Sequence, residues 1–232
     1  VEETVAVFGP VVDRYTMQQS GADGITVRLA YEPRLARVML SDAEVQRIAD
    51  YYVRCAEEGA TPEQIEESAR AMVRMRAILA HPDRIARLAR DMVLHYEALC
   101  AEKPAVVQKA MIVCADRAIA FAVWQEIGRI RPDWTVSRRA ADEGALTPQE
   151  LERLSPLPLV NLVATQGAND PKELYELCGS REYRRMLDRQ FKNPQSNFRV
   201  AVVVDMWITG FDVPALAVMY IDKPLQRHTL IQ

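Results

Sequence analysis

The sequence lacks the features that mark several large classes of protein. Its apolar runs fall well short of the roughly 18–20 residues that a membrane-spanning helix needs. The start VEETVAVFGP has no basic stretch leading into an apolar core, so we expect no secretory signal. Its four cysteines form no C-x-x-C pair, and none of the three histidines stands near them at ligand spacing. We therefore expect reduced thiols in a cytoplasmic protein, without a metal site.

The sequence is also poor in the signals of a complete nucleotide or nuclease site. No G-x-x-x-x-G-K-[ST] pattern occurs, and no glycine-rich loop follows an expected strand, which disfavours an ordinary nucleotide-binding domain. No carboxylate cluster typical of a nuclease is present either. Cys114 is not followed by arginine at the spacing of a phosphatase loop, so we interpret it as a core cysteine. Because the chain begins with Val and ends in HTLIQ, we expect a piece of a longer protein.

What is present is the composition of a globular domain, with 49% hydrophobic and 26% charged residues. Short apolar runs predict buried strands, which alternate with helical patterns and so favour a parallel α/β sheet. The expected strands are 110–115, 159–165, 200–204 and 216–221, and the expected helices start near 82, 116 and 180. Further predictions are a strand at 26–31, helices from 41 onward, and a surface insertion at 131–158 with a short helix after Thr147-Pro148.

Polar residues gather directly after the expected strands. In a parallel sheet, ligands bind at the carboxyl ends of the strands. The richest such segment is DMWITGFDVP, from Asp205 to Pro214. Its glycine permits close backbone approach, its threonine can donate to a phosphate, and its second aspartate can hold a ribose hydroxyl or a cation. On spacing alone, a tight turn capped by aspartate before proline is the favoured interpretation.

The whole string VAVVVDMWITGFDVP, with its continuation LAVMYIDKPLQRHTLIQ, is more specific than its spacing. It resembles the motif V region of the restriction (motor) subunit of type I restriction endonucleases, members of helicase superfamily two. Other segments are similar to the same family, among them KAMIVCADRAIAFAVWQEI and REYRRMLDRQFKNPQSNFRVAVVV. The resemblance covers nearly the whole chain and is weakest over 40–79 and 131–157.

The resemblance implies an architecture and a set of partners. Residues 1–40 would end a first motor domain, 41–104 would be a helical connector or insertion, and 105–232 would be a second RecA-like domain cut at the start of motif VI. The intact protein would use ATP and Mg²⁺, translocate double-stranded DNA, and cleave unmodified DNA. It would work with methyltransferase and specificity subunits.

The resemblance also implies roles for particular residues. Gly210 and Asp212 would line the nucleotide side of a cleft, and Gln232 would begin the next motif, whose two arginines would follow it. Thr209 would face the DNA backbone, and Arg117 would touch a phosphate. Between Gly179 and Arg199, six basic and two acidic residues make a phosphate-facing patch possible.

Simpler interpretations stand beside these. The arginines Arg181, Arg184, Arg185 and Arg189 would by default form a solvated helix face opposite the apolar one, with contact to DNA as the alternative for some of them. Trp207 could stack on a base, although packing under its loop is favoured. The alternative for the whole chain is a non-catalytic α/β binding module. Since one half of a split site is incomplete, we expect this chain alone neither to hydrolyse ATP nor to cut DNA.

Overall fold

A computed structural model describes residues 73, 75–208 and 211–223, together with residues 19, 23, 30 and 32. The chain divides into two compact units, Val1–Leu35 and Ala36–Gln232. The architecture that follows is that of the second unit. The predicted strand at 26–31 and the predicted helices between 41 and 72 lie outside the described residues.

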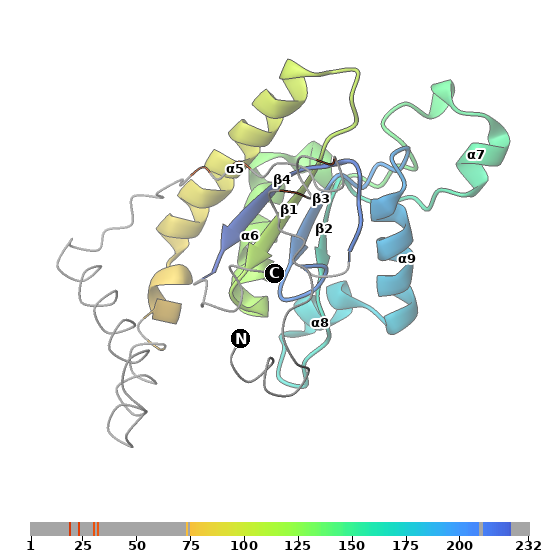
Figure 1. Cartoon of the computed structure of the whole chain (residues 1–232). Coiled ribbons are helices and arrows are strands. Elements are labelled where there is room, and N and C mark those ends of the chain that lie inside the picture. Colours follow the sequence, from red (N-terminus) through yellow and green to blue (C-terminus); the bar gives the residue numbers. More distant parts are fainter. Residues whose placement is uncertain are drawn as a thin grey trace, which may run out of the picture. The chain divides into compact units, whose positions relative to one another are not determined.

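Four parallel strands form the sheet, in the order β2-β3-β1-β4 (Figure 1). They are β1 (Lys109–Cys114), β2 (Val160–Val163), β3 (Val200–Val203) and β4 (Leu216–Asp222). Every residue of β1, β2 and β3 is buried, whereas β4, at the edge, alternates. The short, mainly apolar runs therefore predicted the three fully buried strands correctly, and the expected α/β class with a parallel sheet is confirmed.

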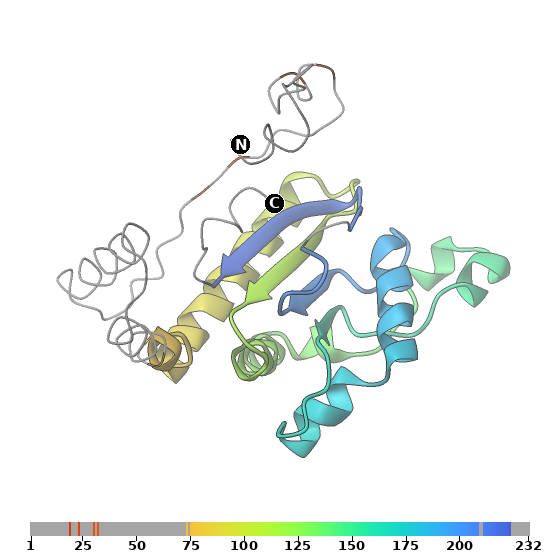
Figure 2. The same cartoon turned by 60° about the horizontal axis from the view of Figure 1, so that its bottom comes forward.

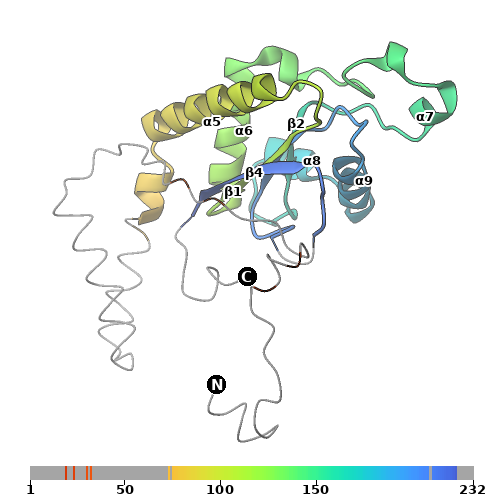
Figure 3. The same ribbon diagram turned by 45° about the horizontal axis from the view of Figure 1, so that its top comes forward.

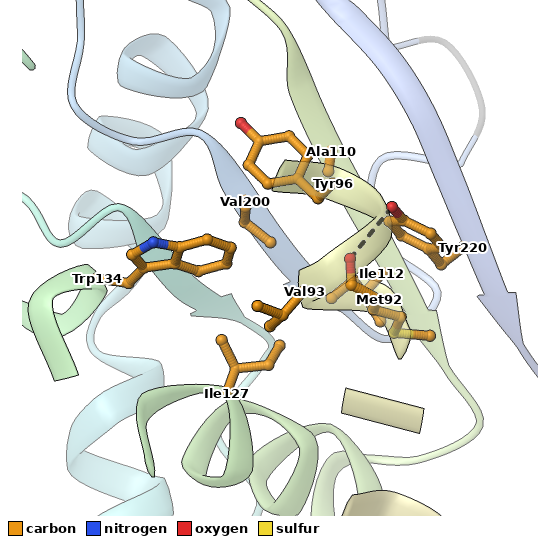
Figure 4. A pocket seen from close by; sticks show the side chains of 9 residues that line it. All are labelled: Met92, Val93, Tyr96, Ala110, Ile112, Ile127, Trp134, Val200 and Tyr220. Carbon is orange, nitrogen blue, oxygen red and sulfur yellow. Dashed lines mark hydrogen bonds between the residues drawn. The ribbon is translucent and has the colours of Figure 1, made fainter. Parts of the chain in front are cut away.

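Two helices, α5 (Pro82–Glu102) and α6 (Arg117–Ile130), lie together on one face of the sheet (Figure 2). Their apolar stripes pack on the residues of β1 and β3 that point to this face, such as Ile112 and Val202. A small cavity remains between α5 and the strands, and apolar side chains including Val93, Ile127 and Trp134 converge on it (Figure 4). We interpret this cavity as a gap in core packing, because apolar side chains line it.

The helix α9 (Arg181–Lys192) covers the opposite face of the sheet. Leu187 and Phe191 of α9 pack there against Met111 of β1 and Val203 of β3. A short helix, α8 (Lys172–Cys178), precedes α9 and places its buried residues in the core shared by α5 and α6. The sequence analysis anticipated α5, α6 and α9, and it missed α8.

The segment between α6 and β2 holds the predicted insertion. It contains two 3₁₀ helices, η1 (Pro132–Thr135) and η2 (Glu143–Ala145), and the short helix α7 (Pro148–Glu152). Thr147 and Glu150 form a capping box at the start of α7, which confirms the predicted short helix. A connection from a helix to the next parallel strand returns to the amino edge of the sheet. Figure 3 shows α7, within this connection, projecting beyond α9. The insertion is therefore remote from the carboxyl ends of the strands.

Candidate functional site

The carboxyl edge of the sheet brings four exit loops together. The strand order places the start of the loop after β3, at Val204 and Asp205, between the loops after β2 and β1. It places Asp222 and Lys223 beside β1. These are the four positions at which polar residues follow the strands in the sequence. This edge is therefore the candidate site.

The exits of β1 and β2 are joined by an arginine–aspartate pair. Arg117 donates from Nε and Nη2 to Oδ1 of Asp170, at 3.2 and 3.1 Å. The other carboxylate oxygen of Asp170 accepts from the backbone N–H of Gly167 at 2.7 Å. Arg117, which the resemblance assigns to a DNA phosphate, therefore already has a carboxylate partner within the domain.

Asp116 performs two structural tasks at the same exit. Its Oδ1 accepts from the backbone N–H of Ile119 at 2.9 Å and so caps the N-terminus of α6. Its Oδ2 accepts from Nε of Arg76 at 2.6 Å. The carboxylate thus ties the helical segment before α5 to the exit of β1.

The exits of β3 and β4 are joined in a similar way. Nζ of Lys223 donates to Oδ1 of Asp205 at 2.5 Å. Next to it, Arg84 of α5 makes a two-pronged ion pair with Asp222, and both side chains are at most 10% exposed. Arg84 also donates from Nη1 to the carbonyl of Leu79 at 3.1 Å.

Four cations at or against the exit loops are thus paired with carboxylates inside the domain. These cations are Arg76, Arg84, Arg117 and Lys223. Burial, with a further contribution from the nearby charge of Asp222, raises the pKa of the Cys114 thiol, which ends β1. The thiol therefore stays protonated and packed in the core, in agreement with its interpretation as a core cysteine.

Aromatic side chains hold the loop that follows β3. Trp207 has a positive φ of 63°, which is rare for a bulky residue. Its ring stacks on Phe211 with centroids 4.5 Å apart and on Phe191 of α9 at 5.5 Å. The interpretation that Trp207 packs under its loop is confirmed.

The predicted site residues of this loop are only partly described. Thr209, Gly210 and Gln232 lie outside the described residues. Asp212 is described and exposed, and the adjacent Val213 is buried in the core beneath α9. The loop therefore enters the core directly after Asp212, the carboxylate that is predicted to face the nucleotide.

Helix α9 carries cations at its exposed surface. Arg181, Arg185 and Arg189 are exposed, as the predicted solvated face requires. Arg184 departs from that expectation, since its Nη1 donates to the carbonyl of Gly179 at 2.7 Å and so fastens the end of α8. Because α9 runs opposite to the strands, its N-terminal end lies at the carboxyl edge of the sheet. Arg181 and Arg185, near that end of the helix, therefore lie toward the carboxyl edge.

A buried lysine at the amino edge was not anticipated. Lys109 begins β1, is fully buried, and donates from Nζ to the carbonyls of Phe191 and Asn193 at 2.6 and 2.8 Å, and to that of Gln190 at 3.3 Å. It caps the C-terminal end of α9. Burial, together with the charge of Arg199, lowers the pKa of Lys109 to about 7. The only sequence signal was a lysine that opens a continuous apolar run.

Two kinds of feature are absent from the described part of the chain. No three His, Cys, Asp or Glu side chains are placed to share a metal ion there. None of the described helices combines the length and apolarity that crossing a bilayer requires.

Comparison with known proteins finds endonuclease subunits of type I restriction enzymes. The chain is 32% identical to the Type I restriction enzyme HindI endonuclease subunit of Haemophilus influenzae, over 100% of this chain and 19% of the relative. It is 26% identical to the Putative type I restriction enzyme MjaIXP endonuclease subunit of Methanocaldococcus jannaschii, over 99% of this chain and 19% of the relative. Over its whole length, this chain is a homologue of type I restriction endonuclease subunits.

Shorter matches agree with this relationship. A 51-residue stretch is 45% identical to the Putative type I restriction enzyme MjaVIIP endonuclease subunit of Methanocaldococcus jannaschii, which is 22% of this chain and 5% of the relative. Residues 167–232 match the family described as Type I restriction enzyme subunit R domain 3, and residues 1–64 match SWI2/SNF2 ATPase. The helicase-like resemblance read from the sequence is therefore confirmed. The chain spans about a fifth of the length of its first two relatives.

Proposed function

We propose that this chain is part of the ATP-dependent DNA-translocating subunit of a type I restriction enzyme. It would contribute one wall of the ATP cleft and a surface that contacts the DNA backbone. The observation that carries the proposal is the placement of the β3 exit loop. The loop leaves the carboxyl edge of a parallel sheet at Asp205, which Lys223 holds there. Through Trp207 and Phe211 it packs on Phe191, near the amino-edge end of α9. A polar, anchored loop start at the carboxyl edge suits a ligand-facing role.

This chain would line only one side of the cleft that binds ATP and Mg²⁺. Gly210, Asp212 and Gln232 would line the nucleotide side of the cleft. The sequence has no phosphate-cradling loop of the G-x-x-x-x-G-K-[ST] type, so another part of the intact protein would supply it. Hydrolysis of ATP would supply the free energy for movement along DNA.

For DNA, the exposed arginines of α9 are the best-supported contacts. Arg181 and Arg185 are exposed cations. A hydrogen bond from its own backbone N–H lowers the pKa of the neighbouring Glu182, and the charges of the two arginines contribute to this lowering. The two arginines lie at the N-terminal end of α9, by the carboxyl edge, whereas Phe191, which packs on Trp207, lies near the other end of the helix. Thr209 and Arg117 would add contacts to the backbone of double-stranded DNA from the carboxyl edge.

The DNA contact can be tested by its salt dependence in the full-length protein. Changing both Arg181 and Arg185 to Ala should weaken binding to double-stranded DNA and reduce the slope of log K against log salt by about 0.9 for each lost phosphate contact. The matched control is the double change of Arg87 and Arg90 to Ala, since both are exposed on α5, on the other face of the sheet. An unchanged slope for the α9 pair would show that these arginines are only solvated.

The remaining roles belong to the intact protein. It would cleave unmodified DNA after translocation, together with methyltransferase and specificity subunits, in the cytoplasm. Because phosphoryl transfer needs a phosphate cradle, a metal and an arginine acting together, this chain alone should not turn over ATP or cut DNA. Steady-state assays on the pure chain would contradict this if turnover followed protein concentration.

The ion pairs at the exit loops favour a second candidate, a non-catalytic α/β module that binds nucleic acid or partner proteins. Four cations there already form ion pairs with aspartates of the domain, as expected if these residues only stabilise the fold. The two candidates differ in whether Asp212 affects ATP turnover by the full-length protein.

A further inference from the structure

We infer that Asp170 is a positioning residue that sets the direction in which Arg117 presents its guanidinium at the carboxyl edge. The inference rests on the proposed contact between Arg117 and a DNA phosphate, and it deepens that contact. It concerns three residues at the exits of two strands: Arg117, which is the first residue of α6 after β1, and Gly167 and Asp170 in the loop after β2.

The carboxylate of Asp170 is fixed by its own turn. The backbone N–H of Asp170 donates to the carbonyl of Gly167 at 3.1 Å. In the opposite direction, Oδ2 of Asp170 accepts from the N–H of Gly167 at 2.7 Å. The side chain of Asp170 is only 9% exposed. Because both hydrogen bonds hold Asp170 within a tight turn, its carboxylate stays in place when the Arg117 side chain moves. It can therefore fix the position of the guanidinium.

Arg117 is held along one edge of its guanidinium. Nε and Nη2 both donate to Oδ1 of Asp170, at 3.2 and 3.1 Å. No described residue accepts from Nη1, and the side chain is 39% exposed. Since a guanidinium has five N–H groups in one plane, pairing at the Nε edge leaves the Nη1 end for an external anion. Asp170 therefore orients Arg117 without using all of its donors.

Gly167 leaves room for this arrangement. A Cβ at position 167 would lie 2.1 Å from Nη2 of Arg117 and 2.9 Å from Oδ2 of Asp170. The nearest atom is the end of a flexible arginine side chain, so an alanine could be accommodated by moving the guanidinium. The backbone of Gly167 does not adopt a positive φ, so the substitution does not strain the chain. Glycine at this position is thus required by the space that the guanidinium and the Asp170 carboxylate occupy, and not by the backbone conformation.

Orientation matters because a free arginine loses rotamer freedom when it binds a phosphate. A side chain that the protein already holds in place loses less, and so binds more tightly for the same contacts. Competition acts in the opposite direction, because a carboxylate and a phosphate bind the same cation. Two variants that preserve net charge separate these effects: Asp170→Glu, which moves the carboxylate, and Gly167→Ala, which displaces the guanidinium.

The experiment measures binding of the full-length protein to a fluorescently labelled double-stranded DNA, with Arg117→Ala as the reference. We expect Asp170→Glu and Gly167→Ala each to weaken binding about threefold to tenfold, which is about 0.7–1.4 kcal/mol. Neither should weaken it further in the Arg117→Ala background, because both act through Arg117. Glu173→Asp, an exposed carboxylate change on α8, should bind as the unaltered protein does. Thermal melting confirms that each variant is folded.

The failures are distinguishable. If Arg117→Ala weakens binding while the two charge-preserving variants bind equally well or more tightly, Asp170 does not position Arg117, and the DNA contact of Arg117 stands. If Arg117→Ala binds as the unaltered protein does, the contact itself is wrong and the inference falls with it. Weakening by both variants that persists in the Arg117→Ala background would also overturn the inference, because the effect would then be structural.

Discussion

At the residue scale, Lys109 has the most demanding environment among the described residues. An ammonium without exposed surface is costly unless its N–H groups are all used. Three backbone carbonyls at the end of α9 accept from it, and the negative end of the helix dipole also favours the charged form. Burial acts in the opposite direction and lowers its pKa to about 7. Lys109 therefore joins β1 to α9 at a position that tolerates few other side chains.

Changing Lys109 to Met should lower the free energy of unfolding by about 2–4 kcal/mol, because buried carbonyls lose their donor while the packing volume is nearly kept. Chemical denaturation of the chain measures this. The control is Lys172→Met, since Lys172 is 86% exposed and its ion pair with Glu176 should contribute less than about 0.5 kcal/mol. Equal stability of the two variants would contradict the capping role.

The same lysine predicts a pH dependence. Its pKa is about 7 in the folded chain and about 10.4 when unfolded, so between these values the unfolded state binds more protons. Stability of the unaltered chain relative to Lys109→Met should therefore rise as the pH increases from about 7 toward 10. Denaturation curves of both proteins at several pH values in this window test the sign. A difference that stays constant or falls would show that Lys109 remains charged when folded.

Individual contacts were the least predictable feature of the site. Arg84 and Asp222 are 138 positions apart, and Arg117 and Asp170 are 53 apart. Hydrophobic periodicity reports which face of an element is buried, and it gives no information about which charges meet. The sequence therefore placed Arg117 at the correct edge of the sheet without revealing that a carboxylate already binds it.

At the element scale, the junction between α8 and α9 depends on one glycine. Gly179 has φ 58° and ψ −174°, a backbone conformation that is essentially restricted to glycine. A Cβ there would also lie 2.5 Å from Cδ1 of Tyr183. The next residue, Ser180, caps α9 by accepting from the N–H of Tyr183 at 3.2 Å. The direction in which α9 leaves the junction, and hence where its arginines lie, depends on this turn.

Gly179→Ala should destabilise the chain by about 1–3 kcal/mol, through both the backbone conformation and the clash. Gly144→Ala is the matched control, because Gly144 is exposed, its φ is not positive, and its added Cβ would meet only a side-chain oxygen at 3.3 Å. The control should change stability by no more than about 0.5 kcal/mol. Thermal unfolding of the two variants side by side decides the matter. A silent Gly179→Ala would mean that the junction can adopt another conformation.

Elements with strong local signals were predicted well. The buried strands β1, β2 and β3 appear as mainly apolar runs, in which β1 opens with Lys109 and β2 contains Asn161. Helix α9 begins beside the serine that caps it. Helix α8 was missed because it has only seven residues, too few to show a helical period, and no side chain caps its N-terminus. Length and capping, rather than composition, separate the predicted elements from the missed one.

At the scale of the whole molecule, ion pairs connect the helices before the sheet to its carboxyl edge. Arg76 reaches Asp116 after β1, and Arg84 of α5 reaches Asp222 at the end of β4. The partly exposed Arg76 pair contributes little to stability, whereas breaking the buried Arg84 pair would leave an uncompensated charge. The helical segment and the exit loops are therefore joined at the edge where we propose that ATP and DNA are bound.

The most direct test of the account is the effect of Asp212→Asn on the full-length protein. The substitution removes one exposed charge beside the buried Val213 and should leave the fold intact. We expect DNA-stimulated ATP turnover to fall at least about tenfold, while affinity for double-stranded DNA stays within about twofold. Glu102→Gln, an exposed change at the far end of α5, should alter neither quantity. Unchanged turnover in Asp212→Asn would contradict a nucleotide-side role for the β3 exit loop and favour the non-catalytic binding module.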